Sequence, residues 1–167
     1  MPDFPQGPWF SGQPLSYPVP TPLRYAIDAR RKGNVMPYYR CAYPLMRMDL
    51  LDAVRDAGVD NLELFDAIVD DPQRTTTHTD FKAVNVLGVA ALADLSKTTR
   101  HGTRPEALIS ADIASLTIDE ARAADLLMVR LAESVSAVVV DERVKRVVEA
   151  RGIPGMTFYD PGEWGTL

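Results

Sequence analysis

Two histidines and one cysteine are the side chains of this chain best suited to bind a metal or act as a nucleophile. His78 and His101 lie in separate polar segments, and Cys41 lies in an apolar, aromatic stretch. A zinc site normally needs three or four closely spaced Cys or His ligands, and a thiol buried in apolar surroundings is inert. We therefore expect no bound metal, no cofactor and no Cys–His catalytic pair.

Carboxylates are the second group that could do chemistry, and they are dense between residues 60 and 71. Two paired acids can hydrolyse a glycosidic bond, with one serving as acid and the other as base or nucleophile. In a chain with 23 Asp and Glu residues, such density is more typical of a solvated face. A small enzyme with an unrecognised carboxylate site remains an alternative. The acids of this stretch are Asp60, Glu63, Asp66, Asp70 and Asp71.

Three of these acids, Asp66, Asp70 and Asp71, form the most distinctive local charge feature of the sequence. A compact acidic patch attracts a basic protein partner by long-range electrostatics. We therefore predict that these three residues contribute to a protein-binding surface. The plainer alternative is that they only keep the protein in solution.

Composition limits the class of protein. The chain has 167 residues, of which 46% are apolar and 25% charged, as in one ordinary globular domain. Its net charge of −5 disfavours nucleic acid and anionic membranes as partners, because both select basic patches. No apolar run approaches the roughly 20 residues that span a bilayer. The first residues lack the basic and apolar regions of a secretory signal, so we expect none. A lone cysteine excludes an internal disulfide, so we expect a cytoplasmic protein; a homo-oligomer stays open.

The first 22 residues are rich in proline, which has no backbone N–H for a helix or a sheet. We predict that residues 1–22 form an extended arm and that residues 23–167 form a single α+β domain. Trp9, Phe10 and Tyr17 lie among the prolines, which favours an arm that packs on the body. A regulatory interaction domain, with the arm as a proline-rich ligand, is the alternative.

The segment near residues 138–160 predicts a helix between two strands. Ala137–Val140 is a β-branched run that suits a buried strand, and Asp141 can cap the helix that follows. Gly152 suits the left-handed position just after a helix. Met156–Tyr159 then predicts a second short strand.

A related pattern of helix, glycine and strand lies near residues 48–66. Asp49–Ala57 predicts a helix, Gly58 takes the place of the later glycine, and Asn61–Phe65 predicts a strand. The similarity is explained either by an internal duplication or by repeated use of one local solution. We expect both units to pack against one central sheet.

Phe81–Ala93 is the longest apolar run and predicts the central strand of that sheet, with Gly88 at a bulge or a close approach. Asp70–His78 predicts a polar loop. Because the elements do not alternate regularly, we predict an α+β fold with a mixed or antiparallel sheet. The remaining expectations are a helix or strand at Leu23–Lys32, an irregular strand at Tyr38–Met46, one or two strands at Leu108–Ile118, a helical turn at Asp119–Ala124 and a strand at Leu126–Leu131.

Three segments carry a family-like pattern. The first, Phe81–Lys97, has an aromatic residue followed four positions later by Asn-Val, and then Asp94 and Ser96. The second, Leu126–Glu133, contains Arg-Leu-Ala-Glu after Val129. The third, Val139–Phe158, combines a helix with the run Gly-Ile-Pro-Gly-Met-Thr-Phe.

In this order and spacing, the three segments resemble immunity protein family 11, the immunity proteins of bacterial polymorphic toxin systems. The family has an aromatic residue where this chain has Val129. The resemblance covers about residues 48–165 and implies an antitoxin that binds a cognate toxin or effector domain and blocks it by occlusion, without catalysis. On that basis we expect Asp66, Asp70 and Asp71 to contribute to toxin binding.

Overall fold

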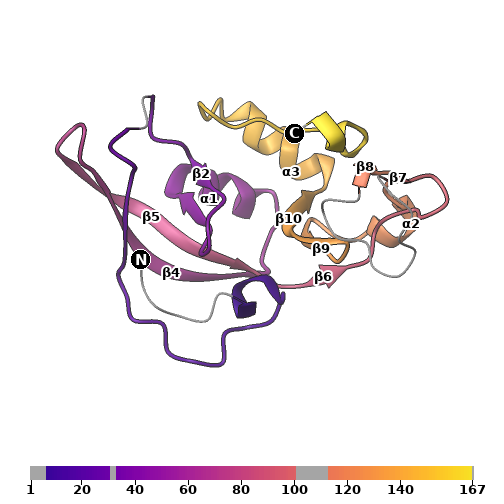
Figure 1. The fold of residues 1–167 in the computed structure, drawn as a ribbon, viewed down its shortest axis with the longest axis horizontal. Helices are drawn as coiled ribbons and strands as arrows, with labels where there is room; N and C mark the ends of the chain where they lie inside the picture. Colours follow the sequence, from indigo (N-terminus) through magenta and orange to yellow (C-terminus); the bar gives the residue numbers. More distant parts are fainter. Residues whose placement is uncertain (1–6, 31–32, 101–112, 167) are drawn as a thin grey trace.

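The computed structural model describes residues 7–30, 33–100 and 113–166, and it has an α+β fold, as predicted (Figure 1). The strands are β1 Leu23–Ala26, β2 Tyr38–Tyr39, β3 Leu45–Arg47, β4 Leu62–Asp71, β5 Thr76–Val86, β6 Val89–Ala90, β7 Thr99–Arg100, β8 Ile113–Ser115, β9 Met128–Leu131 and β10 Ser134–Val140. The helices are α1 Met48–Asp56, α2 Glu120–Ala123 and α3 Glu142–Ala150, with 3₁₀ turns η1 Gly7–Phe10 and η3 Pro161–Thr166.

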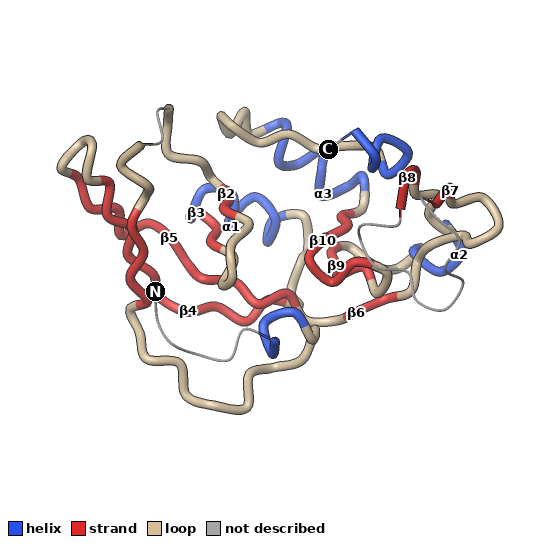
Figure 2. The backbone as a smooth tube through the Cα atoms, in the orientation of Figure 1, coloured by secondary structure: helices blue, strands red, loops and turns tan. Residues whose placement is uncertain are grey.

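A mixed five-stranded sheet in the order β1-β4-β5-β3-β2 forms the larger half of the protein, as Figure 2 shows. Its centre is the antiparallel pair β4 and β5, and β1 joins the outer side of β4 in parallel. Alternate residues of β5 face opposite ways. Phe81 and Ala83 pack in one apolar cluster, and Val84 and Val86 pack in another. The sheet therefore has a core on each face.

The predicted polar loop at Asp70–His78 is mostly strand. β4 continues to Asp71, which pairs with Thr76, and only Pro72–Thr75 forms the turn. His78 therefore lies in β5. The polar ends of β4 and β5 still form backbone hydrogen bonds with each other, although they lie beyond the apolar core. Antiparallel strands can extend into solvent in this way when their side chains are polar.

Gly88 divides the predicted strand Phe81–Ala93 between two sheets. Phe81–Val86 belongs to β5 in the centre of the five-stranded sheet, as expected, but the strand does not continue to Ala93. Gly88 has a φ of +96°, a conformation that L side chains rarely adopt, and the chain turns there into β6. β6 then pairs in parallel with β9 in a three-stranded sheet of order β10-β9-β6.

The earlier helix–glycine–strand unit is confirmed. The face of α1 that carries Leu50, Leu51 and Val54 is buried, Gly58 has a φ of +97°, and β4 follows. α1 packs against α3, so both helices lie over the same face of the sheet (Figure 1).

The later unit is confirmed only as far as its glycine. The Asp141 carboxylate accepts a hydrogen bond of 2.8 Å from the backbone N–H of Arg143, and Gly152 has a φ of +60°. The predicted strand at Met156–Tyr159 is wrong, because this segment has no strand pairing. Pro154 interrupts the backbone donors just before it. Met156 and Phe158 are partly buried against the helical core.

The N-terminal arm packs on the face of the sheet opposite the helices. Trp9 is completely buried, with its ring 5.1 Å from that of Tyr43, and its Nε1 donates to the Tyr17 hydroxyl. The backbone N–H of Gly88 donates to the carbonyl of Gly12 at 2.7 Å. The expected packing of aromatic residues on the body is thus confirmed for Trp9, although Gly7–Phe10 forms a 3₁₀ turn within the predicted extended arm.

Smaller elements complete the fold. The helical turn after Asp119 is present as α2, β9 occupies most of the predicted strand at Leu126–Leu131, and Tyr38–Met46 forms β2 and part of β3. In the predicted stretch Leu108–Ile118, residues 108–112 lie outside the described part, and the strand present is β8. Among the described residues, no helix has the length and apolar character needed to cross a bilayer.

Candidate binding site

The three aspartates of the predicted binding patch all lie on β4, but they have different surroundings. Asp66 is exposed and forms an ion pair with Lys82. Asp70 is half-exposed, lies 3.9 Å from the guanidinium of Arg24 and accepts a hydrogen bond from the hydroxyl of Thr77. Both carboxylates therefore have a cation beside them, which weakens the field that they project.

Asp71 is buried, with a side chain 1% exposed, and it organises the turn between β4 and β5. Its carboxylate accepts backbone hydrogen bonds from Gln73 and Arg74, and the Arg74 guanidinium lies 2.7 Å away. The hydrogen bond from Arg74 holds the pKa of Asp71 below its usual value. The exposed part of the predicted patch therefore consists of Asp66 and Asp70.

The histidines and the cysteine are not brought together among the described residues. His78 lies on β5 with its ring edge-on to Phe81, and His101 lies outside the described part of the chain. Cys41 is partly buried between β2 and β3. Within the described ranges, no group of three or more His, Cys, Asp or Glu residues is arranged to hold a metal ion.

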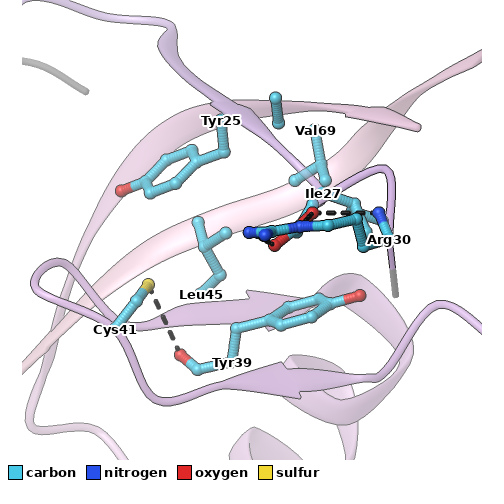
Figure 3. Close-up of a pocket in the computed structure, with 9 residues that line it drawn as sticks. Tyr25, Ile27, Arg30, Tyr39, Cys41, Leu45 and Val69 are labelled. Carbon is cyan, nitrogen blue, oxygen red and sulfur yellow. Dashed lines mark hydrogen bonds and ion pairs between the residues drawn. The ribbon is translucent and has the colours of Figure 1, made fainter. Parts of the chain in front are cut away.

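A pocket of about 430 Å³ lies between β1 and β2, the two edges of the five-stranded sheet. Because both edge strands line it, the sheet must curl around it. Figure 3 shows Tyr25 and Tyr39 on opposite sides, with Leu45 between them and Arg30 reaching in from the loop after β1. The lining residues are Tyr25, Ala26, Ile27, Asp28, Arg30, Tyr39, Cys41, Leu45 and Val69.

The polar atoms on the inner wall of the pocket already have hydrogen-bond partners. The hydroxyl of Tyr25 and the thiol of Cys41 both donate to the carbonyl of Tyr43, at 3.2 and 3.1 Å. Burial raises the pKa of Tyr25 and the pKa of Cys41, so both groups stay neutral near pH 7. The interior therefore presents a mainly apolar surface to any ligand.

Charge is concentrated at the mouth of the pocket. The side chain of Arg30 is 91% exposed and forms an ion pair of 3.0 Å with Asp28. A smaller hollow of about 230 Å³ adjoins this mouth and shares Ile27 and Tyr39 with it. Arg74 lines that hollow and donates to the carbonyl of Gly33 at 2.6 Å, which braces the loop that follows β1.

Arg130, on β9, is a second unusual group. It is 1% exposed, and its Nη1 donates to the carbonyl of Val135 at 3.0 Å, while Nε and Nη2 have no hydrogen-bond partner. Its guanidinium lies over the ring of Phe10, 5.1 Å from the centroid. Burial lowers the pKa of Arg130, because desolvation disfavours the charged form.

Neither the pocket nor the state of Arg130 was predicted from the sequence. The aromatic stretch from Tyr38 is the available signal for the pocket, but on its own it predicts an irregular strand. Neither a family model nor a curated protein matches the chain.

Proposed function

We propose that this protein is a cytoplasmic immunity protein that binds a cognate bacterial toxin or effector domain and neutralises it by occlusion. The observation that carries the proposal is the order and spacing of the three family-like segments in the sequence. It acts in this proposal by binding alone, so its contact surface must be sought on the exterior of the fold.

The places of the three segments in the fold support the proposal. The first segment contains the second half of β5 and all of β6, the second contains β9, and the third contains the end of β10 and all of α3. β6 pairs with β9, and β9 pairs with β10, so the segments adjoin one another. Matches that belong to one contiguous unit are more informative than matches scattered over a surface.

The size of the protein is adequate for this role. A standard protein–protein interface covers about 800 Å² on each partner. The accessible surface of the chain is 9710 Å², so such an interface would cover about one twelfth of it. Blocking a toxin therefore requires one limited surface, leaving the remainder free.

A growth assay tests the proposal. The protein is co-expressed with the toxin domain encoded beside it, and growth is compared with that of cells that carry the toxin domain alone. We expect growth to be restored and the two proteins to co-purify. A chain that neither restores growth nor binds the neighbouring domain is not its antitoxin.

The contribution of the acidic residues is tested separately. Reversing Asp66 and Asp70 to lysine should slow association with a basic toxin and weaken its salt dependence, because exposed charges act mainly on association rates. Asp52→Lys on the exposed side of α1 is the matched control. Equal rates in both variants would remove the acidic residues from the contact and leave the immunity proposal unchanged.

A further inference from the structure

We propose that the guanidinium of Arg130 is a receptor for an acidic side chain of a partner protein, and that Phe10 covers it until the partner binds. The inference rests on the proposed function only in taking the partner to be a protein. It adds a contact on β9 that is separate from the exposed aspartates of β4.

One edge of the Arg130 guanidinium has two N–H groups without a partner. Nη1 donates to the carbonyl of Val135 at 3.0 Å, whereas Nε and Nη2 are buried and have no hydrogen-bond partner within the described part of the chain. The Nε–H and Nη2–H bonds point the same way from one edge of the planar group, and they match the two oxygens of a carboxylate. The unsatisfied part of Arg130 is therefore the edge with which arginine binds an acidic side chain.

The charge of Arg130 is also uncompensated. Among the described residues, no acidic side chain forms an ion pair with it. Glu133, the acid nearest to it in the sequence, instead accepts a hydrogen bond of 3.1 Å from the backbone N–H of Ala93. A buried charge without a partner is costly, and a carboxylate from outside would compensate the charge and both N–H groups together. Charge complementarity therefore selects an acidic side chain as the ligand.

Phe10 is the cover of this site. Its ring lies over the guanidinium, with Arg130 Cζ 5.1 Å from the ring centroid, and Arg130 is only 1% exposed. Phe10 is partly exposed, whereas the preceding Trp9 is completely buried and fixes the 3₁₀ turn to the sheet. Since side chains with solvent access change rotamer rapidly, rotation of Phe10 can uncover Arg130 without releasing the arm.

Two exposed valines beside Arg130 give a partner apolar surface next to the charge. Val89 lies opposite Arg130 in the pair of β6 and β9, and Val135 supplies the carbonyl that accepts its hydrogen bond. These side chains are 40% and 43% exposed, so they are two of the five large apolar side chains that are exposed among the described residues. Arginine is enriched at the apolar, well-packed centres of protein interfaces. This setting favours a protein over a free small carboxylate.

The test follows the side-chain Nε–H signal of Arg130 by NMR in the full-length, ¹⁵N-labelled protein; the signal is identified by its loss in Arg130→Met. The probes are sodium acetate, acetyl-Val-Glu-Val-amide and acetyl-Val-Gln-Val-amide. In Phe10→Ala, we expect the Glu peptide to shift this signal at millimolar concentration and the Gln peptide to leave it in place. The natural protein should need about tenfold more Glu peptide, because its binding-competent state is populated only in part.

Tyr159→Ala is the matched control, since it truncates a 58% exposed aromatic side chain of another segment and should respond like the natural protein. Phe10→Leu repeats the test with more of the apolar packing retained. An Arg130 signal that ignores the Glu peptide in both Phe10 variants, or moves equally with the Gln peptide, would overturn the receptor. Equal binding to the Phe10 variants and the natural protein would overturn the cover. Acetate binding as tight as that of the Glu peptide would overturn the protein partner in favour of a free carboxylate.

Arg130→Met separates this inference from the proposed function. It removes the charge and keeps an apolar side chain of similar length, so it should weaken binding of the neighbouring toxin domain by about thirtyfold, the lower end for loss of a buried charge pair. Unchanged affinity would overturn the contact with Arg130 and leave the immunity proposal intact. Binding of the Glu peptide without restored growth would end the immunity proposal and keep the receptor.

Discussion

The pocket between β1 and β2 and the surroundings of Arg130 both bury polar groups among apolar side chains, but they do so in opposite ways. In the pocket, Tyr25 and Cys41 are neutral and share the carbonyl of Tyr43, with open space beside them. At Arg130, a guanidinium has one hydrogen bond and two unpartnered nitrogens, and Phe10 of the arm covers it.

This difference separates polar groups that cost little to bury from a charged group that lowers stability. Neutral, hydrogen-bonded groups cost little to bury, so the pocket can stay open without a large penalty. An unpaired buried charge costs several kcal/mol even after the protein relaxes. The packing of the arm must offset that cost, so the arm is part of the stable fold and should not be treated as a free extension.

Gly12→Ala should have the largest effect, because it disrupts the contact between the arm and the chain at Gly88 and Val89. A Cβ at Gly12 would lie 2.5 Å from Val89 Cγ2 and 2.8 Å from the carbonyl carbon of Gly88, and the φ of Gly12 is +69°. We expect a loss of about 3 kcal/mol in the free energy of unfolding, measured in urea.

Gly152→Ala is the matched control for this variant. Its φ is +60°, but an added Cβ meets nothing within 4 Å, so only backbone strain of about 1 kcal/mol is expected. Equal losses in the two glycine variants would show that the arm contributes little to stability. The contrast with the pocket would then lose its energetic basis.

Arg130→Met tests the cost of the unpaired charge directly. Methionine keeps much of the volume and removes the charge, so we expect the free energy of unfolding to rise by about 1–2 kcal/mol. Arg130→Ala, which also leaves a cavity, should lose stability instead. If Arg130→Met is less stable than the natural protein, the contacts of Arg130 with Phe10 and Val135 outweigh the cost of its desolvation. Arg130 would then stabilise the fold, contrary to the contrast drawn with the pocket.

Local signals in the sequence predicted the helices and their ends. The cap at Asp141 and the left-handed glycines Gly58 and Gly152 act within a few residues, so they can be recognised without a tertiary structure. The prediction of a strand at Met156–Tyr159 was wrong because a strand forms only where a second strand is available to pair with it. β4 pairs with β5, whereas the later segment pairs with no strand.

The pocket could not be predicted in the same way, because its walls come from segments far apart in the sequence. Tyr25 and Val69 come together only because β1 pairs in parallel with β4, which no local pattern indicates. Arg130 lies in a strand that was predicted correctly, but its burial depends on Phe10 more than a hundred residues earlier. The aspartates show the reverse problem: Asp66, Asp70 and Asp71 are close in sequence and were predicted to form one patch, but the turn buries Asp71.

Tyr25→Phe sharpens the pocket side of the comparison. It removes one of the two donors to the carbonyl of Tyr43, so we expect a loss of about 1 kcal/mol in the free energy of unfolding. Combining it with Cys41→Ala should cost more than the sum of the single changes, because the thiol then no longer compensates. Strict additivity in this double-mutant cycle would mean that the two donors do not depend on a shared acceptor.

The smallest effect concerns the protonation of Cys41. Burial raises the pKa of this thiol by more than its hydrogen bonds lower it, so the folded state favours the neutral form. The neutral thiol therefore contributes its full stabilisation at any pH below the thiol pKa of the unfolded chain. This stabilisation is lost as the pH rises through the higher thiol pKa of the folded protein.

Alkylation by iodoacetamide reports this directly, since the chain has a single cysteine. The rate should rise with pH around a higher midpoint in the folded protein than in the urea-unfolded chain, because the thiolate is the reactive form. A folded midpoint at or below the unfolded one would reveal a stabilised thiolate. The pocket would then hold a charged group, as the surroundings of Arg130 do, and its interior would no longer be neutral and mainly apolar.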